Sequence, residues 1–286
     1  MHGSLLRKKK FKVKKNTGTT GFEPYKNVLA GHPLAKRLHK DLIPFTTEML
    51  TKLGANAENS GICDPWELDS TVELFPPPLD NSMFAEAYIY SIEVNSHLVN
   101  LIFAIERLED ICVYISRFPQ PRTFERQDIT EDKWIHYHHS NFLVAAVGIF
   151  DTALLLVNSV LMLGIEPRWC KKGAVFKGKA VHDTLIEKAL EELDTVVDPF
   201  RDHRHQYVHR NVMPKLKSIE LFSLYSFLKR TGNPVLGDQD LDAVYDITRK
   251  KMVRELKQVV HEISERLMEL FDSLQPAYES HASANK

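Results

Sequence analysis

The sequence predicts an all-α protein: an antiparallel four-helix bundle with an N-terminal extension that is partly helical and partly irregular. Apolar residues recur every three or four positions through four long segments, which is the spacing of one buried helix face. Breakers rich in glycine and proline separate these segments, and no alternating strand pattern competes with them. Long helices joined by short connections favour antiparallel neighbours. The four predicted helices span residues 82–118, 131–164, 182–210 and 239–275.

The first predicted helix begins after Asn81 or Ser82, either of which is a good N-cap residue. It ends at the Phe118–Pro121 segment, because two prolines cannot continue a helix. Its apolar stripe comprises Tyr88, Ile92, Leu98, Leu101, Ile102, Ile105, Leu108, Cys112 and Ile115.

The second predicted helix contains a segment, residues 141–165, that is long and apolar enough to cross a membrane. Asp151 lies near the middle of this segment and Asn158 follows it. An unpaired carboxylate is costly at bilayer depth, so we favour a central helix of a soluble bundle and expect no membrane contact.

The third predicted helix starts near His182 and contains Pro199, which should kink or restart it. A short helix is predicted over residues 216–230, and the final helix has the most regular stripe of the chain. A basic loop precedes the third helix and contains Arg168, Lys171, Lys172, Lys177 and Lys179. The stripe of the final helix comprises Tyr245, Met252, Leu256, Val259, Ile263, Leu267, Leu270 and Leu274.

Three regions divide the chain: residues 1–81 (a basic tail, a short helix and a proline-rich linker), the bundle over 82–275, and a disordered tail over 276–286. The short helix is expected within 33–54. The basic run between Arg7 and Lys15 is either an arm for RNA phosphates or a solvated tail, and the solvated tail is the preferred interpretation.

Composition sets further limits on function. The net charge of −1 means that any nucleic-acid site must be a local basic patch. Cys63, Cys112 and Cys170 are far apart and lack metal-binding spacing, which argues against a disulfide scaffold or a structural zinc site. The basic N-terminus lacks the apolar region of a secretory signal. A cytoplasmic location is therefore predicted.

The segment from Asp198 to Arg210 contains three histidines and three arginines within thirteen residues. On an ideal helix Arg201, Arg204, His205 and His209 fall within about 140° of one another. Such a face suits RNA cleavage by internal transfer, because histidine titrates near neutral pH and can move the protons of the reaction. A guanidinium can bind the phosphate and stabilise the charge of the transition state, and neither role requires a metal.

The segment Arg204-His205-x-x-x-His209 resembles the active-site motif of the HEPN superfamily, whose members are helical bundles and often ribonucleases with an Arg-x(4–6)-His motif. The resemblance covers residues 82–275 and implies that Arg204 holds the phosphate and His209 does the acid–base work. His205 would orient one of them or contact the RNA. Arg201 and Arg210 are predicted to bind substrate.

The resemblance implies a metal-independent endoribonuclease that leaves a 2′,3′-cyclic phosphate and needs no cofactor. It also implies a homodimer with two motifs face to face, a role in toxin–antitoxin systems or antiviral defence, and an antitoxin or nucleotidyltransferase as partner. The alternative is a helical dimerisation or binding module for RNA or another partner, without catalysis, since a fold alone does not establish function.

Other histidines and arginines allow competing interpretations. Arg254 and His261 fit the looser motif, but they lie midway along the last helix and Glu255 follows the arginine, so we discount them. The spacing of His205 and His209 also suits a metal on a helix, but the paired Glu-x-x-His signature of bundle metal sites is absent. The cluster His136–His139 could line the same cleft or bind metal; a surface-exposed helix start, with Trp134 and Tyr137 packing, is preferred.

Overall fold

The computed structural model describes residues 28–43, 86–119, 122–127, 129–210, 217–231 and 241–284. Within these ranges the chain is helical and contains no strand, which confirms the predicted fold class. The long helices are α2 (Glu86–Ser116), α4 (Glu131–Val160), α6 (Leu185–Arg210) and α8 (Leu241–Ala284). The shorter elements are η1 (Leu29–Gly31), α3 (Arg122–Arg126), η3 (Pro167–Trp169), α5 (Lys172–Val175) and α7 (Lys217–Thr231).

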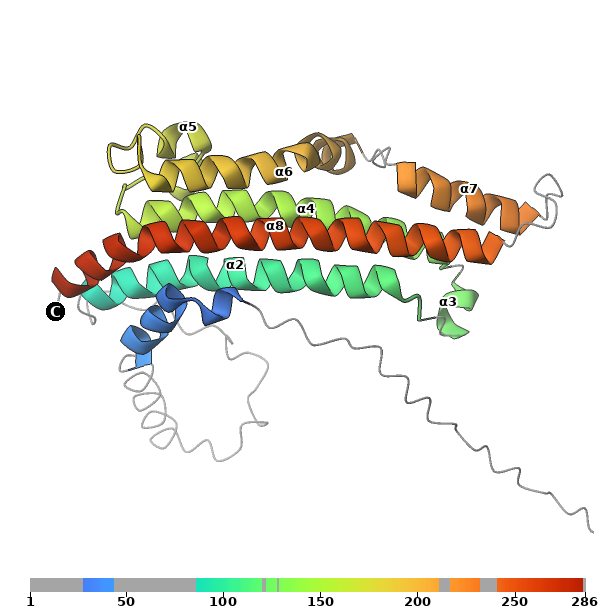
Figure 1. The fold of residues 1–286 in the computed structure, drawn as a ribbon, viewed down its shortest axis with the longest axis horizontal. Helices are drawn as coiled ribbons and strands as arrows, with labels where there is room; N and C mark the ends of the chain where they lie inside the picture. Colours follow the sequence, from blue (N-terminus) through green and yellow to red (C-terminus); the bar gives the residue numbers. More distant parts are fainter. Residues whose placement is uncertain are drawn as a thin grey trace, which may run out of the picture.

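The four long helices form an antiparallel bundle in which successive helices run in alternating directions (Figure 1). α2 packs against α4, α4 against α6, α6 against α8 and α8 against α2, which closes the ring around one core. α7 continues the layer of α6 and packs against α8 and α4 (Figure 1). All four predicted long segments and the predicted short helix therefore correspond to helices of the structure.

α4 is the most buried of the long helices. Its residues Phe142, Ala146, Ile149 and Ala153 are fully buried in the core. By length and composition α4 could cross a membrane, but 67% of its most apolar window is buried inside the bundle. This burial is typical of the core helix of a helical bundle.

The N-terminal segment, residues 28–43, is attached to α8. Leu29, Leu34 and Leu38 are fully buried in the core. The His32 ring packs edge-on against Phe271, and its Nε2 atom lies 3.0 Å from a carboxylate oxygen of Asp272. The predicted helix is observed over residues 33–43. Its continuation to residue 54, the linker over 55–81 and the basic run of the N-terminus lie outside the described residues.

The prediction of a disordered tail from residue 276 is wrong for most of that tail, because α8 continues to Ala284 with Pro276 inside the helix. The Tyr278 side chain is fully buried and stacks on Tyr90 with ring centroids 5.7 Å apart. Its hydroxyl donates to Asp41 and also lies 3.3 Å from the Ser91 hydroxyl. These contacts hold the last turns against α2 and the N-terminal segment, and they outweigh the helix bond that the proline removes.

Replacing Tyr278 by alanine should lower the free energy of unfolding by about 3–5 kcal/mol, because it removes a fully buried aromatic ring and leaves a cavity. Urea denaturation followed by circular dichroism measures the effect. Glu279→Ala changes the neighbouring exposed position and is the matched control. Equal midpoints for the two variants would contradict the packing of this helix end.

Candidate functional site

The start of α6 is fixed by a hydrogen-bonded turn. The backbone N–H of Asp183 donates to Glu187 at 2.6 Å, and the Glu187 N–H donates to the Thr184 hydroxyl, as in a capping box. His182, Asp183 and Glu187 also bring three ligand atoms within 4.8 Å of one another and could hold a metal ion. The group lies at the surface, and the capping bonds already account for Glu187.

The path of α6 follows from the residues on its inner face. In the first half of the helix this face carries Leu190, Leu193 and Val197, all buried. Arg204 lies seven residues after Val197 and therefore occupies the same face two turns later. A guanidinium is costly to bury without a partner, so the second half of α6 cannot remain packed in the core.

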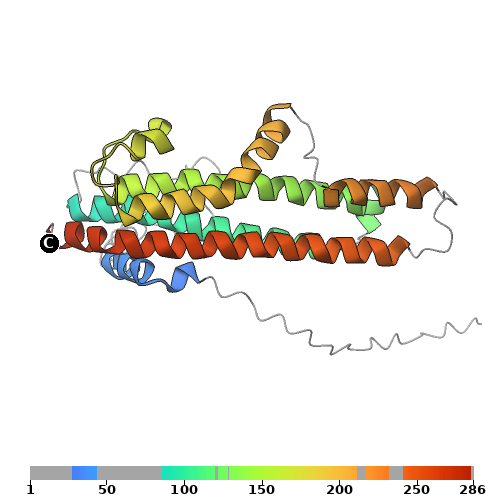
Figure 2. The same ribbon diagram turned by 45° about the horizontal axis from the view of Figure 1, so that its top comes forward.

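Figure 2 shows that the last part of α6 rises away from α4 and α8. Pro199 lies inside the helix, as the sequence predicted, and a proline in this position removes one helix hydrogen bond and favours a bend. The Arg/His segment is thus carried on a helix end that projects from the bundle.

Arg204 is half-buried, and its Nε atom is buried without a hydrogen-bond partner among the described residues. A guanidinium N–H normally finds an acceptor when it leaves water. The side chain is therefore held in place with donor capacity unused, which is the arrangement that a bound anion would complete.

His205 and His209 are exposed on the same projecting helix end, with ring centroids 4.7 Å apart. Arg210 is also exposed, in the last turn. Neither histidine forms an ion pair with any residue that the structure describes. The three predicted catalytic residues, Arg204, His205 and His209, thus lie on one short stretch of helix, with both histidines exposed to solvent.

Arg201 has a different environment. Its guanidinium forms ion pairs with Asp194 and, at 2.8 Å, with Asp198, and it lies 5.0 Å from the centre of the Phe150 ring. Lys172 donates to the same Asp194 carboxylate at 2.7 Å. Burial raises the pKa of Asp194, but the hydrogen bonds from Lys172 and Arg201 outweigh it and hold the pKa below its usual value. Arg201 therefore ties α6 to itself and to α4.

A group of histidines on α4 faces the region where α6 leaves the bundle. His138 and His139 are buried, so the preferred interpretation of this cluster as an exposed helix start is wrong for both. The His138 ring packs against Tyr114 of α2 and Trp134 of α4, with ring centroids 4.9 and 4.2 Å away. α7 lies over the same part of α4, where its Ser223 hydroxyl lies 2.7 Å from His136 Nε2. One feature of the sequence could have predicted this burial: His136 and His139 are spaced i, i+3 on an otherwise apolar helix.

Burial, together with the smaller effect of the positive charges of His136 and His203, lowers the pKa of His139 to about 4. The proximity of His203, which precedes Arg204, places His139 beside the base of the Arg/His segment. The Nδ1 atoms of His136 and His139 are buried without a hydrogen-bond partner among the described residues. The neutral form of His139 is therefore the one that the fold accepts near pH 7.

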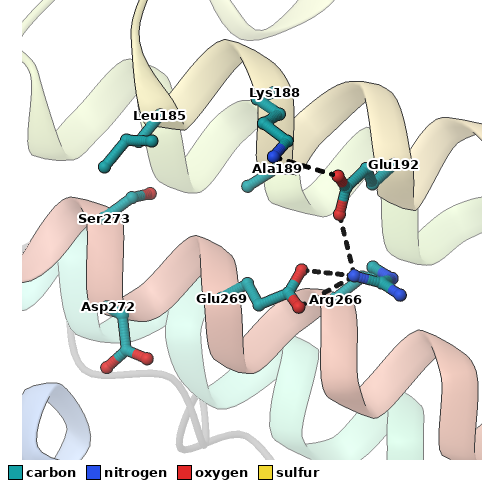
Figure 3. A pocket seen from close by; sticks show the side chains of 8 residues that line it. All are labelled: Leu185, Lys188, Ala189, Glu192, Arg266, Glu269, Asp272 and Ser273. Atoms are coloured by element: carbon teal, nitrogen blue, oxygen red, sulfur yellow. Dashed lines mark hydrogen bonds and ion pairs between the residues drawn. The ribbon is translucent and has the colours of Figure 1, made fainter.

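A groove of about 490 Å³ lies between the first half of α6 and α8, away from the Arg/His segment. Figure 3 shows that its charges pair with one another. Arg266 bonds Glu192 at 2.8 Å and Glu269 at 2.7 Å, and Lys188 lies 3.8 Å from Glu192. Because these groups neutralise each other, this groove is a weaker candidate for an anion than the projecting end of α6.

The fold and this helix end together define the class of protein: it is a helical bundle that carries an arginine and two histidines on one projecting helix end. The model of the Cthe2314-like HEPN family matches residues 90–275, which is more than half of the chain. The chain belongs to this family, as the resemblance of its motif predicted. Searches of curated proteins and of solved structures find no significant match.

Membership of the family indicates a nuclease-like or nucleotide-binding function. The matched range begins within α2 and ends within α8, so it includes all four bundle helices and the Arg/His segment.

The low pKa of His139 makes stability depend on pH. The unfolded histidine takes up a proton near pH 6.5, whereas the folded one does so near pH 4. The contribution to stability is therefore complete above pH 6.5 and is lost as the pH falls towards 4, by about 3 kcal/mol. In His139→Gln, the fall in unfolding free energy between pH 7 and pH 4 should shrink by this amount. The exposed His182→Gln serves as control, and the same pH dependence in both variants would contradict the assignment.

Proposed function

We propose that the protein is a metal-independent endoribonuclease whose site is the Arg204, His205 and His209 face of α6. The observation that carries the proposal is the state of these three side chains. Arg204 keeps an unpartnered buried N–H, and the two histidines have no carboxylate partner among the described residues. A purely structural arginine looks different, as Arg201 does with its two aspartates.

The proposed reaction needs only the substrate and these side chains. A neutral imidazole, that of His209, removes the proton of the ribose 2′-OH, whose oxygen attacks the adjacent phosphorus. The bond from phosphorus to the 5′-oxygen breaks, and an imidazolium, which we assign to His205, protonates the leaving oxygen. Arg204 binds the non-bridging oxygens and stabilises their extra charge. The products are a 2′,3′-cyclic phosphate and a 5′-hydroxyl.

The two predicted substrate-binding arginines take different parts in this proposal. Arg210 is exposed and bears a charge that can meet a phosphate next to the cleaved bond. Arg201 keeps its pairs with Asp194 and Asp198 and holds the helix that carries the motif. Its contribution to RNA binding is then mainly indirect.

A second copy of the chain would complete the site. In one chain the motif lies on a projecting helix end, open to solvent, and an exposed site leaves electrostatic interactions weak. Two such ends placed face to face would form a cleft with two arginines and four histidines. We therefore propose a homodimer as the active form.

We further propose that the activity acts on RNA in the cytoplasm, in a toxin–antitoxin or antiviral setting, with an antitoxin or nucleotidyltransferase as regulator. The buried free thiols of Cys112 and Cys170 agree with a reducing compartment.

The proposal is tested by cleavage of a mixed RNA pool in excess EDTA. The unmodified protein should cleave, and His209→Ala and Arg204→Ala should each reduce the rate by about a hundredfold or more, because each removes one element of transition-state stabilisation. His261→Ala is the matched control: it alters the other loose copy of the motif and should cleave normally.

Cleavage that persists in His209→Ala, or that requires an added divalent metal, would refute this site. RNA binding by the unmodified protein without cleavage, over a wide range of RNAs and protein concentrations, would favour the binding module instead.

A further inference from the structure

The connection between α4 and α6 presents an exposed tryptophan among basic side chains. Trp169, in η3, is 63% exposed. The residues that follow it in this connection are packed, since Cys170, Val175 and Val181 are buried. The backbone N–H of Trp169 donates to the Glu166 carbonyl at 2.8 Å. The indole is thus held outward by a well-packed support. An exposed tryptophan ordinarily marks a contact surface.

One cation already lies against this ring. The Arg168 guanidinium is 5.4 Å from the centre of the indole and is oriented by an ion pair with Glu166 at 2.9 Å. An arginine on an aromatic ring is a cation–π pair, and both groups can stack on a nucleobase. The pair therefore offers two adjoining planar surfaces.

Three lysines follow Trp169 in the same connection between α4 and α6: Lys171, Lys177 and Lys179. All three are exposed, and none forms an ion pair with a residue in the described part of the chain. Lys172 differs, because Asp194 holds it. Unpaired lysines around a stacking ring are the combination that binds single-stranded nucleic acid, with phosphates on the lysines and bases on the ring.

One carboxylate, that of Asp194, forms ion pairs both with this connection and with the helix that carries the Arg/His segment. Its partners are Lys172, which lies in α5 shortly after Trp169, and Arg201 of α6. Ten residues separate Asp194 from Arg204, which is about 15 Å along a helix. A strand that follows α6 from Lys172 towards Arg204 would cover this distance with a few extended nucleotides.

We propose that Trp169, Arg168 and the lysines Lys171, Lys177 and Lys179 form a docking platform for single-stranded RNA, which binds the strand at a distance from the Arg/His segment. Binding itself does not require cleavage. The role of the platform in delivering substrate rests on the proposed function.

The test measures binding of a fluorescein-labelled, unstructured RNA of twelve nucleotides by anisotropy, with full-length His209→Ala as the parent so that cleavage does not interfere. Adding Trp169→Ala should weaken binding about tenfold, the loss of one stacked base. Adding Phe103→Ala, which removes an aromatic ring of similar exposure on α2, should change nothing.

The lysines are tested by salt dependence. Replacing Lys171, Lys177 and Lys179 by glutamine should make the slope of log affinity against log salt shallower by about 2, because each phosphate contact on a single strand contributes about 0.7. Trp169→Ala should leave that slope unchanged.

The platform would be overturned if the parent did not bind the RNA, if Trp169→Ala bound as tightly as the parent, or if the lysine variant kept its salt slope. Vesicles containing phosphatidylserine form a separate arm: Trp169-dependent binding to vesicles with Trp169-independent binding to RNA would identify a lipid surface instead. Trp169-dependent RNA binding without any cleavage by the unmodified protein supports the platform and refutes the ribonuclease. Cleavage that depends on His209, together with RNA binding that does not depend on Trp169, would support the ribonuclease and refute the platform.

Discussion

The position of one arginine on the inner face of α6 shapes the whole candidate site. Arg204 continues the stripe of Leu193 and Val197, where a bundle helix would ordinarily place an apolar side chain. Desolvating a whole guanidinium without a partner costs several kcal/mol, which disfavours packing this turn of α6 in the core. α6 therefore leaves the bundle after its bend, and His205 and His209 are exposed with it (Figure 2).

Other contacts stabilise the bundle where the last part of α6 no longer packs against it. Arg201 replaces the lost packing with ion pairs to Asp194 and Asp198 and with contact to the Phe150 ring. α7 covers the part of α4 that α6 no longer reaches and bonds His136 through Ser223. Buried polar atoms at this junction, among them Arg204 Nε and His139 Nδ1, have no hydrogen-bond partner among the residues that the structure describes. Such groups are rare in folded proteins and concentrate where a ligand or a functional constraint accounts for them.

Much of this architecture could be predicted from the sequence, because the helical period is strong over long segments and the breakers between them are unambiguous. The Arg204–His209 motif and the bend at Pro199 were also readable, since both depend on local sequence. The features that were missed depend on contacts between distant segments. α8 extends beyond Pro276 because Tyr278 packs on Tyr90, and no local pattern announces that contact.

The same reason explains why the surroundings of the site were not foreseen. The burial of His138 depends on Tyr114 of another helix, and the pairing of Arg201 depends on Asp194, seven residues before it, together with Phe150 of α4. The exposure of the Trp169 side chain could not be predicted from the sequence either, because tryptophan side chains are more often largely buried than exposed.

The central claim is that the Arg204–His209 face cleaves RNA through the substrate's own 2′-hydroxyl. The most direct test uses an RNA of known cleavage position in which only the nucleotide before that bond is replaced by its 2′-deoxy form, in the presence of EDTA. We predict that cleavage at that bond disappears, while the unsubstituted RNA yields a 2′,3′-cyclic phosphate and a 5′-hydroxyl. Continued cleavage at the 2′-deoxy position would contradict the account, because the attacking oxygen would then come from elsewhere.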